Sequence, residues 1–352
     1  MSSNSINILV VDDSAVMRTL VTDMINKEPG FQTIGVAMNG TEAARKCGQL
    51  KPDVVLMDME MGDSDGLDGV QLIMAECPTP IIILTSMKNT EASPVMEAIN
   101  AGAVDYHQKP DRTITGFDHH DELLFEKIRS AATAKLDVYQ KVADTSRHKI
   151  TETHTFLEAT TYEIVVIGSS TGGPSAVEAI ITRLPKNLNV PVVIAQHMPD
   201  NFIVSFANRL NQLTQLEVIV ASKNMILKSG YIYIAPASGN LIVREDRLAG
   251  NKVFDFTSDR FKDFNNPSAT GLMLSIAEVY KGKSIGVVLT GMGRDGSEGL
   301  KAIKEAGGYT IAQSKETCVV FGMPGSAIEL GAITKVVPID QIAQFVVSCL
   351  DC

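Results

Sequence analysis

The sequence predicts an α/β protein of two domains, each built on a parallel β-sheet. At 352 residues the chain is longer than one hydrophobic core usually supports, so two domains are expected. Short apolar runs rich in β-branched residues alternate with longer helix-like stretches, which is the pattern of parallel strands with helices on both faces. This alternation occurs twice, on either side of a polar stretch at residues 118–160.

The first domain is expected over residues 1–130. Its strands are predicted from INILVV at 6–11, DVVLM at 53–57, PIIIL at 80–84 and the shorter AVDYHQ that precedes Lys109. Large apolar residues become rare after Leu136, so a helix is expected to run into a linker over 131–160.

The second domain is expected over residues 161–352. Its predicted strands are EIVVIG, PVVIAQ, LEVIVA, YIYIAP, SIGVVLT and YTIAQ, each followed by a turn or helix-like segment. This predicts a larger, Rossmann-like doubly wound sheet.

The composition excludes several classes of protein. The net charge of −10 argues against nucleic acid as a partner, because binding a phosphate backbone needs a basic face. The first residues lack a basic flank, and no apolar run approaches the roughly 18 residues of a membrane span, so neither a signal peptide nor membrane insertion is expected. Five scattered cysteines fit a reducing, cytoplasmic location, with Cys349 and Cys352 expected in a loose tail.

Five polar residues follow the apolar runs of the first domain: Asp12, Asp13, Asp58, Thr85 and Lys109. The carboxyl ends of parallel strands meet at one edge of a sheet, so these side chains are expected to gather there. Clustered carboxylates need a cation, and hard oxygen ligands suit Mg²⁺. A carboxylate beside Mg²⁺ can attack phosphorus, while a lysine and a hydroxyl neutralise the phosphoryl oxygens. The simpler alternative is that Asp12 and Asp13 cap the helix-like segment that follows them.

These segments resemble the receiver domain of bacterial response regulators. The resemblance rests on ILVVDDSAVMR, DVVLMDMEM, the Asp65-Gly66 pair, ILTS and the Lys109-Pro110 pair, and it implies a flavodoxin-like fold with a five-stranded parallel sheet. It implies that Asp58 accepts the phosphoryl group and that Thr85 and Lys109 contact it. It also implies a Mg²⁺ site formed by Asp12, Asp13, Asp58 and the backbone carbonyl of Glu60. Gly62 stands where the family usually has proline, and the same loop carries additional acidic residues.

A glycine-rich turn opens the second domain. Gly168-x-Ser170-x-Gly172 follows a predicted strand and precedes a predicted helix, which is the spacing of a nucleophile elbow. The backbone N–H groups at such a helix start can stabilise an oxyanion. Ser169 competes with Ser170 for the role of nucleophile, and a turn of this kind can instead bind phosphate or only cap a helix.

A histidine and an aspartate follow later strands of the same domain. His197 comes after PVVIAQ and can serve as general base, and Asp295 comes after SIGVVLT and can orient the imidazole. The chain order Ser, His, Asp differs from that of the α/β-hydrolases. The same loop also carries Gly291-x-Gly293-x-x-Gly296, the spacing of a dinucleotide-binding turn.

The motifs of this half, taken in order, resemble the catalytic domain of chemotaxis protein-glutamate methylesterases, the CheB family. The motifs are GSSTGGP, AQHMP, IAPASGN, Pro267-Ser268, VLTGMGRDG and VFGMPGSA. The resemblance implies a catalytic triad of Ser170, His197 and Asp295, with Met292 in the oxyanion loop and Thr171 supporting the serine turn. After Pro267-Ser268 the family usually continues Val-Asp, where this chain has Ala269-Thr270.

The two resemblances together imply an enzyme that phosphorylation activates. The expected reaction is hydrolysis of glutamate γ-methyl esters on chemoreceptor cytoplasmic helices, with release of methanol, and deamidation of receptor glutamines. A chemotaxis-type histidine kinase is the expected phosphoryl donor, and no cofactor is expected in the catalytic half. Two alternatives stay open: a signalling protein that binds a nucleotide through Gly291–Gly296, and a serine hydrolase of small soluble esters.

Overall fold

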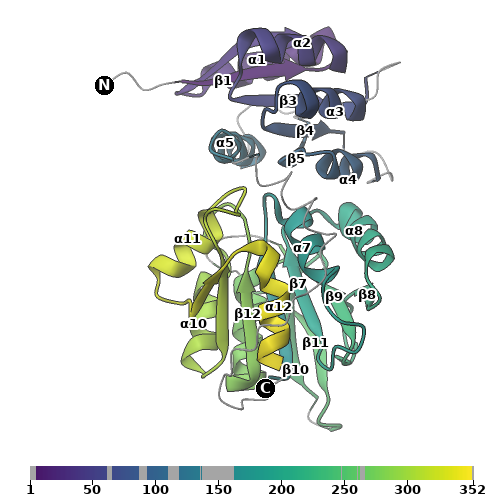
Figure 1. The fold of residues 1–352 in the computed structure, drawn as a ribbon, viewed down its shortest axis with the longest axis vertical. Helices are drawn as coiled ribbons and strands as arrows, with labels where there is room; N and C mark the ends of the chain where they lie inside the picture. The colour runs from purple at the N-terminus through teal and green to yellow at the C-terminus, as the bar shows by residue number, and fades with distance from the viewer. Residues whose placement is uncertain are drawn as a thin grey trace. The chain divides into compact units, whose positions relative to one another are not determined.

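The computed structural model describes residues 5–61, 66–86, 93–109, 119–134, 136, 162–246, 248–259, 261 and 266–350. The chain divides into two compact units, Met1–Leu136 and Asp137–Cys352 (Figure 1). Most of the expected linker at 131–160 and the loop at 62–65 lie outside the described residues.

The first unit contains a five-stranded parallel sheet with the strand order β2-β1-β3-β4-β5. Its strands are β1 (Ile6–Val11), β2 (Phe31–Ala37), β3 (Val54–Asp58), β4 (Ile81–Thr85) and β5 (Asp105–Gln108). The inner strands β3 and β4 are almost entirely buried, as expected for strands covered on both faces.

The connections between these strands contain the helices α1 (Ala15–Lys27), α2 (Gly40–Leu50), α3 (Gly66–Glu76) and α4 (Ser93–Asn100), and α5 (His119–Ala131) follows β5. Ser14 caps α1 and Asn39 caps α2, and each side chain accepts a hydrogen bond from a first-turn N–H. The βα connections place the carboxyl ends of β1, β3, β4 and β5 at one edge of the sheet.

The second unit contains a seven-stranded parallel sheet with the order β14-β13-β12-β6-β7-β9-β8. Its strands are β6 (Ile164–Ser169), β7 (Val192–Gln196), β8 (Glu217–Val220), β9 (Tyr231–Ile234), β12 (Ser284–Val288), β13 (Tyr309–Gln313) and β14 (Lys335–Val337). The chain runs outward from β6 through β7 and later returns to β12 on the other side of β6. The carboxyl ends of β6 and β12 therefore form a topological switch point, where ligands bind in folds of this type.

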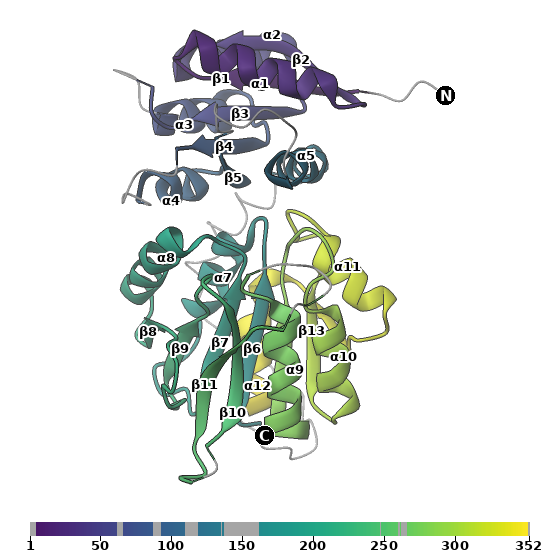
Figure 2. The ribbon, with the colours of Figure 1, turned by 180° about the vertical axis from the view of Figure 1, so that it is seen from behind.

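Helices cover both faces of this sheet, as the two views from opposite sides show (Figures 1 and 2). One face carries α7 (Gly173–Ile181), α8 (Asp200–Leu213) and α12 (Ile339–Leu350), and the other carries α9 (Ala269–Tyr280) and α10 (Ser297–Glu305). Helix α11 (Gly322–Glu329) follows β13 and packs on α10, and the 3₁₀ turn η1 (Lys281–Lys283) leads from α9 into β12. An antiparallel hairpin of β10 (Asn240–Glu245) and β11 (Lys252–Thr257) packs against α9.

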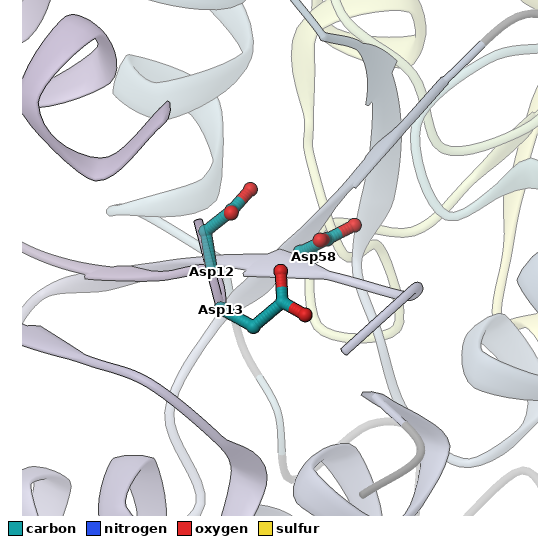
Figure 3. A group of neighbouring side chains, drawn as sticks. All are labelled: Asp12, Asp13 and Asp58. Atoms are coloured by element: carbon teal, nitrogen blue, oxygen red, sulfur yellow. The ribbon is translucent and has the colours of Figure 1, made fainter. Parts of the chain in front are cut away.

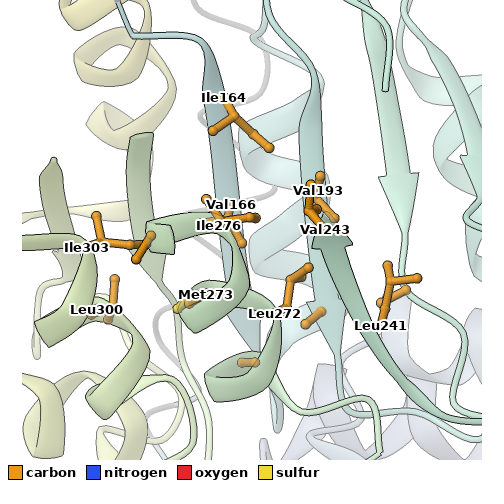
Figure 4. Close-up of a cluster of buried hydrophobic side chains, with 14 of the residues drawn as sticks. Ile164, Val166, Val193, Leu241, Val243, Leu272, Met273, Ile276, Leu300 and Ile303 are labelled. Carbon is orange, nitrogen blue, oxygen red and sulfur yellow. The ribbon is translucent and has the colours of Figure 1, made fainter. Parts of the chain in front are cut away.

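The largest part of the core lies under α9 (Figure 4). Leu272, Met273 and Ile276 of this helix are fully buried against side chains from β6, β7, β10 and α10. Glycines allow this close packing: a Cβ on Gly299 would lie 2.5 Å from the Cβ of Met273. The first turn of α9 is thereby fixed next to the carboxyl ends of β6 and β12.

The predicted fold class is confirmed, with differences in detail. Strands β2, β10, β11 and β14 were not expected from apolar runs, because their side chains are partly exposed or polar. The expectation that Cys349 lies in a loose tail is wrong: it belongs to α12 and is 1% exposed, because it faces the core side of an amphipathic helix. In the described part of the chain, no helix has both the length and the apolar character needed to cross a membrane.

Candidate phosphorylation and hydrolase sites

The carboxylates predicted in the first unit lie together at the edge of its sheet (Figure 3). Asp12 and Asp13 follow β1, and Asp58 ends β3; one carboxylate oxygen from each lies within 4.8 Å of the others. Asp12 and Asp58 are each 1% exposed, whereas Asp13 is exposed. The backbone of the cluster is held by Arg18, which donates hydrogen bonds to the carbonyl oxygens of Asp12 and Asp13 at 2.6 and 3.0 Å.

Lys109 supplies the positive charge facing these acids. Its Nζ lies 2.7 Å from Asp58 Oδ2 and 3.0 Å from Asp12 Oδ2. Both Oδ2 atoms are buried and have Lys109 as their ion-pair partner, and a carboxylate oxygen paired in this way still has a lone pair that can bind a cation. Hard oxygen donors of this kind are ligands that suit Mg²⁺.

Burial dominates the titration of Asp58. It raises the pKa of Asp58 to about 6, against the opposing effect of Lys109 and of the Glu60 N–H that donates to Asp58 Oδ1. Burial alone would lower the pKa of Lys109, but its ion pairs with Asp58 and Asp12 outweigh this and raise that pKa. The site therefore carries a buried carboxylate whose charge is poorly solvated, which favours binding of a cation beside it.

Thr85 and Glu60 lie on the flanks of this acidic site. Thr85 ends β4, and its carbonyl oxygen accepts the N–H of Lys109 at 2.8 Å, so the two strand ends are joined. The carboxylate of Glu60 accepts a hydrogen bond from Ser86 at 3.0 Å.

Gly66, the first residue of α3, packs closely against the backbone of Asp58. A Cβ at Gly66 would lie 2.4 Å from the Asp58 carbonyl oxygen, which gives a steric reason for the glycine of the Asp65-Gly66 motif. Asp63 and Asp65 of that motif lie outside the described residues, and Asp68 is exposed in the first turn of α3.

In the second unit the serine turn joins β6 to α7. Gly172 is the N-cap of α7 and has φ of +73°, a conformation that favours glycine, and Pro174 stands in the first turn. No side chain caps this helix, so its N-terminal N–H groups point to the turn rather than to a capping hydroxyl.

The two serines of the turn have different environments. Ser169 is fully buried, and its hydroxyl donates a hydrogen bond to Gln196 Oε1 at 2.7 Å. Ser170 is partly exposed, and its hydroxyl forms no hydrogen bond with any residue that the structure describes. This geometry favours Ser170 as the hydroxyl that a substrate can reach.

His197 lies next to the serine turn because of strand register. Ser169 of β6 pairs with Gln196 of β7, so Ser170 and His197 are the residues that leave the sheet side by side. The imidazole Nε2 lies 2.8 Å from Asp295 Oδ2, and the histidine side chain keeps 14% exposure. The other ring nitrogen, Nδ1, takes no part in this contact.

Asp295 lies in the loop between β12 and α10, and its side chain is fully buried against the N-terminus of α9. Its carboxylate accepts hydrogen bonds from the N–H groups of Ala269, Thr270 and Gly296 at 2.8–2.9 Å and from the Ser268 hydroxyl at 3.2 Å. Burial alone would raise the pKa of Asp295, but these donors and His197 outweigh it and lower the pKa to about 2. The departure at Ala269-Thr270 thus affects the helix turn that holds the carboxylate, and the backbone donors there are independent of side-chain type.

The predicted oxyanion loop lies against Ser170. A Cβ on Gly291 would come within 2.9 Å of the Ser170 Cβ, so the loop backbone passes close to the serine. Met292 is the next residue and is partly exposed. The N–H groups of Met292 and Gly172 donate to no acceptor among the described residues. Thr171 is buried in the turn, and its carbonyl oxygen accepts the hydroxyl of Thr290 at 3.0 Å.

The dinucleotide-binding alternative has little support in this geometry. The N–H of Gly296, where a phosphate would bind at the start of α10, donates to Thr270 Oγ1 and to Asp295 Oδ1. A carboxylate in that position repels a phosphate. At the end of β13, where the motif needs an acid for ribose, the buried Gln313 instead accepts the N–H of Thr290 at 2.7 Å.

Sequence reasoning assigned no role to three residues that hold this site together. Ser268 is the N-cap of α9, and its hydroxyl donates a hydrogen bond to Asp295. The hydroxyl of Thr290 contacts the carbonyl oxygens of Thr171 in the serine turn and of Val320. The side-chain amide of Gln196 forms hydrogen bonds with Ser169, Ser170 and His197. Their motifs were visible in AQHMP, VLTGMGRDG and Pro267-Ser268, but residue order does not tell which way a side chain points.

Comparisons with known proteins agree along both units. The family model described as CheB methylesterase matches residues 165–346, and the one described as response regulator receiver domain matches residues 8–115. A protein-glutamate methylesterase/protein-glutamine glutaminase of Archaeoglobus fulgidus is 40% identical over 345 residues, which covers 98% of both chains. A Thermotoga maritima protein of the same name is 41% identical over 347 residues, with the same coverage of 98% of both chains.

A solved structure supports the second unit. The crystal structure of the Thermotoga maritima CheB methylesterase catalytic domain is 41% identical, with a TM-score of 0.51 over 53% of this chain and 98% of that one. The family models, the full-length relatives and this structure all agree with the two resemblances seen in the sequence. The chain therefore belongs to the CheB methylesterase family and carries a response regulator receiver domain ahead of its methylesterase domain.

Proposed function

We propose that the protein is a phosphorylation-activated protein-glutamate methylesterase that also deamidates protein glutamines. Its substrates are methylated glutamates and glutamines on the cytoplasmic helices of methyl-accepting chemoreceptors, and it acts in the cytoplasm. The proposal is supported by full-length relatives named for both activities and by the receiver domain in the same chain. A chemotaxis-type histidine kinase donates the phosphoryl group.

The observation that best supports hydrolase activity is the His197–Asp295 pair next to a partly exposed serine, Ser170. His197 Nε2 lies 2.8 Å from Asp295 Oδ2, and the pairing of β6 with β7 brings His197 next to Ser170. A buried acid with a pKa of about 2 stays charged at any physiological pH, so it holds the imidazole in one orientation and stabilises the imidazolium.

Hydrolysis follows from these positions in two steps. Ser170 Oγ attacks the ester carbonyl while His197 Nδ1 accepts the hydroxyl proton; the C–O bond to methoxide then breaks, and methanol leaves with that proton. Water next attacks the acyl-serine ester, His197 accepts its proton, and the free glutamate leaves as the proton returns to Ser170. With glutamine the leaving group is ammonia, and the second step is the same.

Charge on the tetrahedral oxygen needs donors that are not already bonded. The N–H groups of Met292 and Gly172 meet this condition among the described residues, and both belong to loops that adjoin Ser170. Thr171 supports the turn from within the buried side, through the bond of its carbonyl oxygen to Thr290.

In the receiver domain, Asp58 is the proposed phosphoacceptor. Asp12, Asp13, Asp58 and the backbone carbonyl of Glu60 would hold Mg²⁺, which when bound supplies positive charge next to the phosphoryl oxygens. Lys109 Nζ lies 2.7 Å from Asp58 Oδ2, close enough to pair with a phosphoryl oxygen on that atom. Thr85, at the end of the adjacent strand, donates its hydroxyl to another phosphoryl oxygen.

The test measures methanol release from a methylated receptor cytoplasmic fragment, with and without Mg²⁺ and a small-molecule phosphoryl donor. We expect wild type to release methanol faster with donor and Mg²⁺, Ser170→Ala to release none, and Asp58→Asn to lose only the response to the donor. Ser169→Ala is the matched control, because its hydroxyl is buried and donates to Gln196 of the neighbouring strand β7.

Two outcomes would change the proposal. Methanol release by Ser170→Ala at the wild-type rate would remove the serine mechanism. Hydrolysis of small free esters with no hydrolysis of the receptor fragment would favour a general serine hydrolase over a methylesterase.

A further inference from the structure

We propose that Gln196 is a positioning residue that fixes the main chains of Ser170 and His197 at a set separation through its single side-chain amide. The inference rests on the proposed function, since it takes Ser170 and His197 as the reacting pair. It concerns a residue that contacts neither substrate nor reacting atoms and acts through the backbone of both.

Gln196 is 2% exposed, and both N–H groups and the oxygen of its side-chain amide form hydrogen bonds at the two strand ends. Its Nε2 donates to the carbonyl oxygen of Ser170 at 3.0 Å and to that of His197 at 3.1 Å. Its Oε1 accepts the hydroxyl of Ser169 at 2.7 Å. One planar group therefore bonds to both strand ends at once, and its two N–H bonds end on the two proposed catalytic residues.

The backbone needs this additional bond because the sheet ends here. The last ladder bond between β6 and β7 runs from the His197 N–H to the Ser169 carbonyl at 3.0 Å. Beyond it, the N–H of Ser170 bonds to Thr290 at 3.1 Å, which ties the serine toward β12 and not toward the histidine. Among the described residues, Gln196 provides the bond that continues the β6–β7 pairing past its last rung.

The chain also keeps space for this amide. A Cβ on Gly173 would lie 2.1 Å from Gln196 Oε1 and 2.9 Å from its amide carbon. Gly173 has no positive φ, so its backbone does not require glycine, and the close approach of the amide accounts for the small residue.

Three variants separate the donors from the acceptor. Gln196→Glu keeps an acceptor for Ser169 and loses both N–H donors, Gln196→Met loses donors and acceptor, and Ser169→Ala removes the acceptor's partner alone. If the donors position the pair, the two Gln196 variants slow the reaction of Ser170 by roughly 10- to 100-fold, the range expected from displacing a reacting group by about 1 Å. Ser169→Ala slows it far less.

The readout is the rate at which a fluorophosphonate probe phosphonylates Ser170 in the full chain, with loss of fluoride. The rate is expressed per reactive site, and the number of reactive sites is titrated separately. A purely structural role lowers the number of sites and the melting temperature but leaves the rate per site unchanged. Thr310→Val is the matched control, because this fully buried hydroxyl makes several hydrogen bonds at the opposite end of β13, away from the triad. In methanol release, the Gln196 variants should lower kcat with little change in KM.

The outcomes distinguish this inference from the proposed function. Equal labelling rates per site in wild type, Gln196→Glu and Gln196→Met overturn the positioning role while the serine mechanism stands. Failure of the probe to label Ser170 in wild type overturns the proposed function itself. If neither Gln196 variant folds, Gly173→Ala takes their place, since it displaces the amide without removing it; a rate per site equal to wild type would then overturn the inference.

Discussion

His197 presents Nε2, not Nδ1, to Asp295, at 2.8 Å. In the serine protease arrangement the acid bonds Nδ1 and the serine faces Nε2. In this chain Nε2 is the nitrogen that pairs with the acid, so Nδ1 is the nitrogen that remains for the proposed nucleophile, Ser170. The chemistry needs only that the two nitrogens face opposite partners, so this orientation is compatible with the general-base role proposed for His197.

Asp295→Asn should nearly abolish hydrolysis. The amide lacks the charge that stabilises the imidazolium, and its NH₂ group would face the backbone N–H donors of α9 or the ring of His197. By analogy with other triads we expect kcat to fall by about 10³- to 10⁴-fold. The check is methanol release from receptor fragment, with KM measured in parallel; a fall of less than about tenfold would show that the acid is dispensable for the mechanism.

The stability of the protein should depend on the charge of Asp295 in acid. Its folded-state pKa of about 2 lies below the ordinary value of 3.8, so the charged form stabilises the fold above pH of about 4. That contribution, roughly 2 kcal/mol from about 1.4 kcal/mol per pKa unit, is lost as the pH falls from about 4 toward 2. In urea unfolding, the difference between the free energies of unfolding of wild type and Asp295→Asn should therefore be smaller at pH 3 than at pH 7.

Asp255 is the control for that experiment. Its pKa is also lowered to about 2, by Arg244 first and then by neighbouring donors, but its side chain is 20% exposed on the β10–β11 hairpin. Solvent screens such pairs, so Asp255→Asn should change the free energy of unfolding much less than Asp295→Asn at neutral pH. Equal effects of the two substitutions would contradict the role assigned to burial.

Much of this site could be predicted because parallel strands put their last residues at one edge. Asp12, Asp58, Thr85 and Lys109 lie where the strand ends predicted them, and so do the residues of the second unit. The resemblances added what spacing alone could not decide, such as Ser170 over Ser169. The functional roles themselves stay predictions until the variants are measured.

What the sequence did not predict has physical reasons. Strand β2 has the burial pattern of an edge strand, so its apolar signal is weak, and the β10–β11 hairpin pairs outside the main sheet. The roles of Gln196 and Ser268 depend on side-chain direction at strand and helix ends, which residue order leaves open. The prediction that Cys349 lies in a loose tail is wrong because it relied on the position of Cys349 near residue 352. The helical period of α12 places this cysteine on the buried face.

Lys109→Ala should destabilise the receiver domain and make its stability depend on Mg²⁺. The substitution leaves Asp12 and Asp58 buried next to each other without the cation that pairs with both, at a cost of about 3–5 kcal/mol. Added Mg²⁺ should recover part of the lost melting temperature, and chelation should remove it again. Calorimetry of the full chain with Mg²⁺ or with a chelator provides the measurement.

Lys127→Ala is the matched control for Lys109→Ala. Lys127 forms a similarly shielded ion pair with Asp105 at 3.0 Å, with 15% of its side chain exposed, but Asp105 is outside the acidic cluster. Mg²⁺ should not restore its melting temperature. Equal recovery of both variants would mean that Mg²⁺ acts generally on this acidic protein rather than at Asp12, Asp13 and Asp58.

Gly66→Ala should slow the phosphorylation of Asp58 and so weaken the activation that depends on it. The added Cβ would lie 2.4 Å from the carbonyl oxygen of Asp58 and 2.7 Å from the Cα of Met59, both backbone atoms that cannot rotate away. The segment after Asp58 must move, so we expect slower phosphorylation and a weaker response of methanol release to donor, with basal release unchanged. Gly48→Ala is the control, since a Cβ there meets nothing within 4 Å; loss of the response in that variant would point to global damage.

Ser268→Ala should lower both stability and turnover, because one hydroxyl serves two groups. Its Oγ accepts the N–H of Gly271 at 3.1 Å as the cap of α9 and donates to Asp295 Oδ1 at 3.2 Å. Loss of a cap typically costs about 1 kcal/mol, and Asp295 keeps its backbone donors, so kcat should fall by a few-fold rather than by the factor expected for Asp295→Asn. Ser14→Ala removes the corresponding cap of α1 in the receiver domain. Methanol release and melting temperature of the two variants should therefore diverge: both lose stability, and only Ser268→Ala loses basal turnover. Equal basal turnover in both variants would mean that the Ser268 hydroxyl caps α9 without helping to hold Asp295.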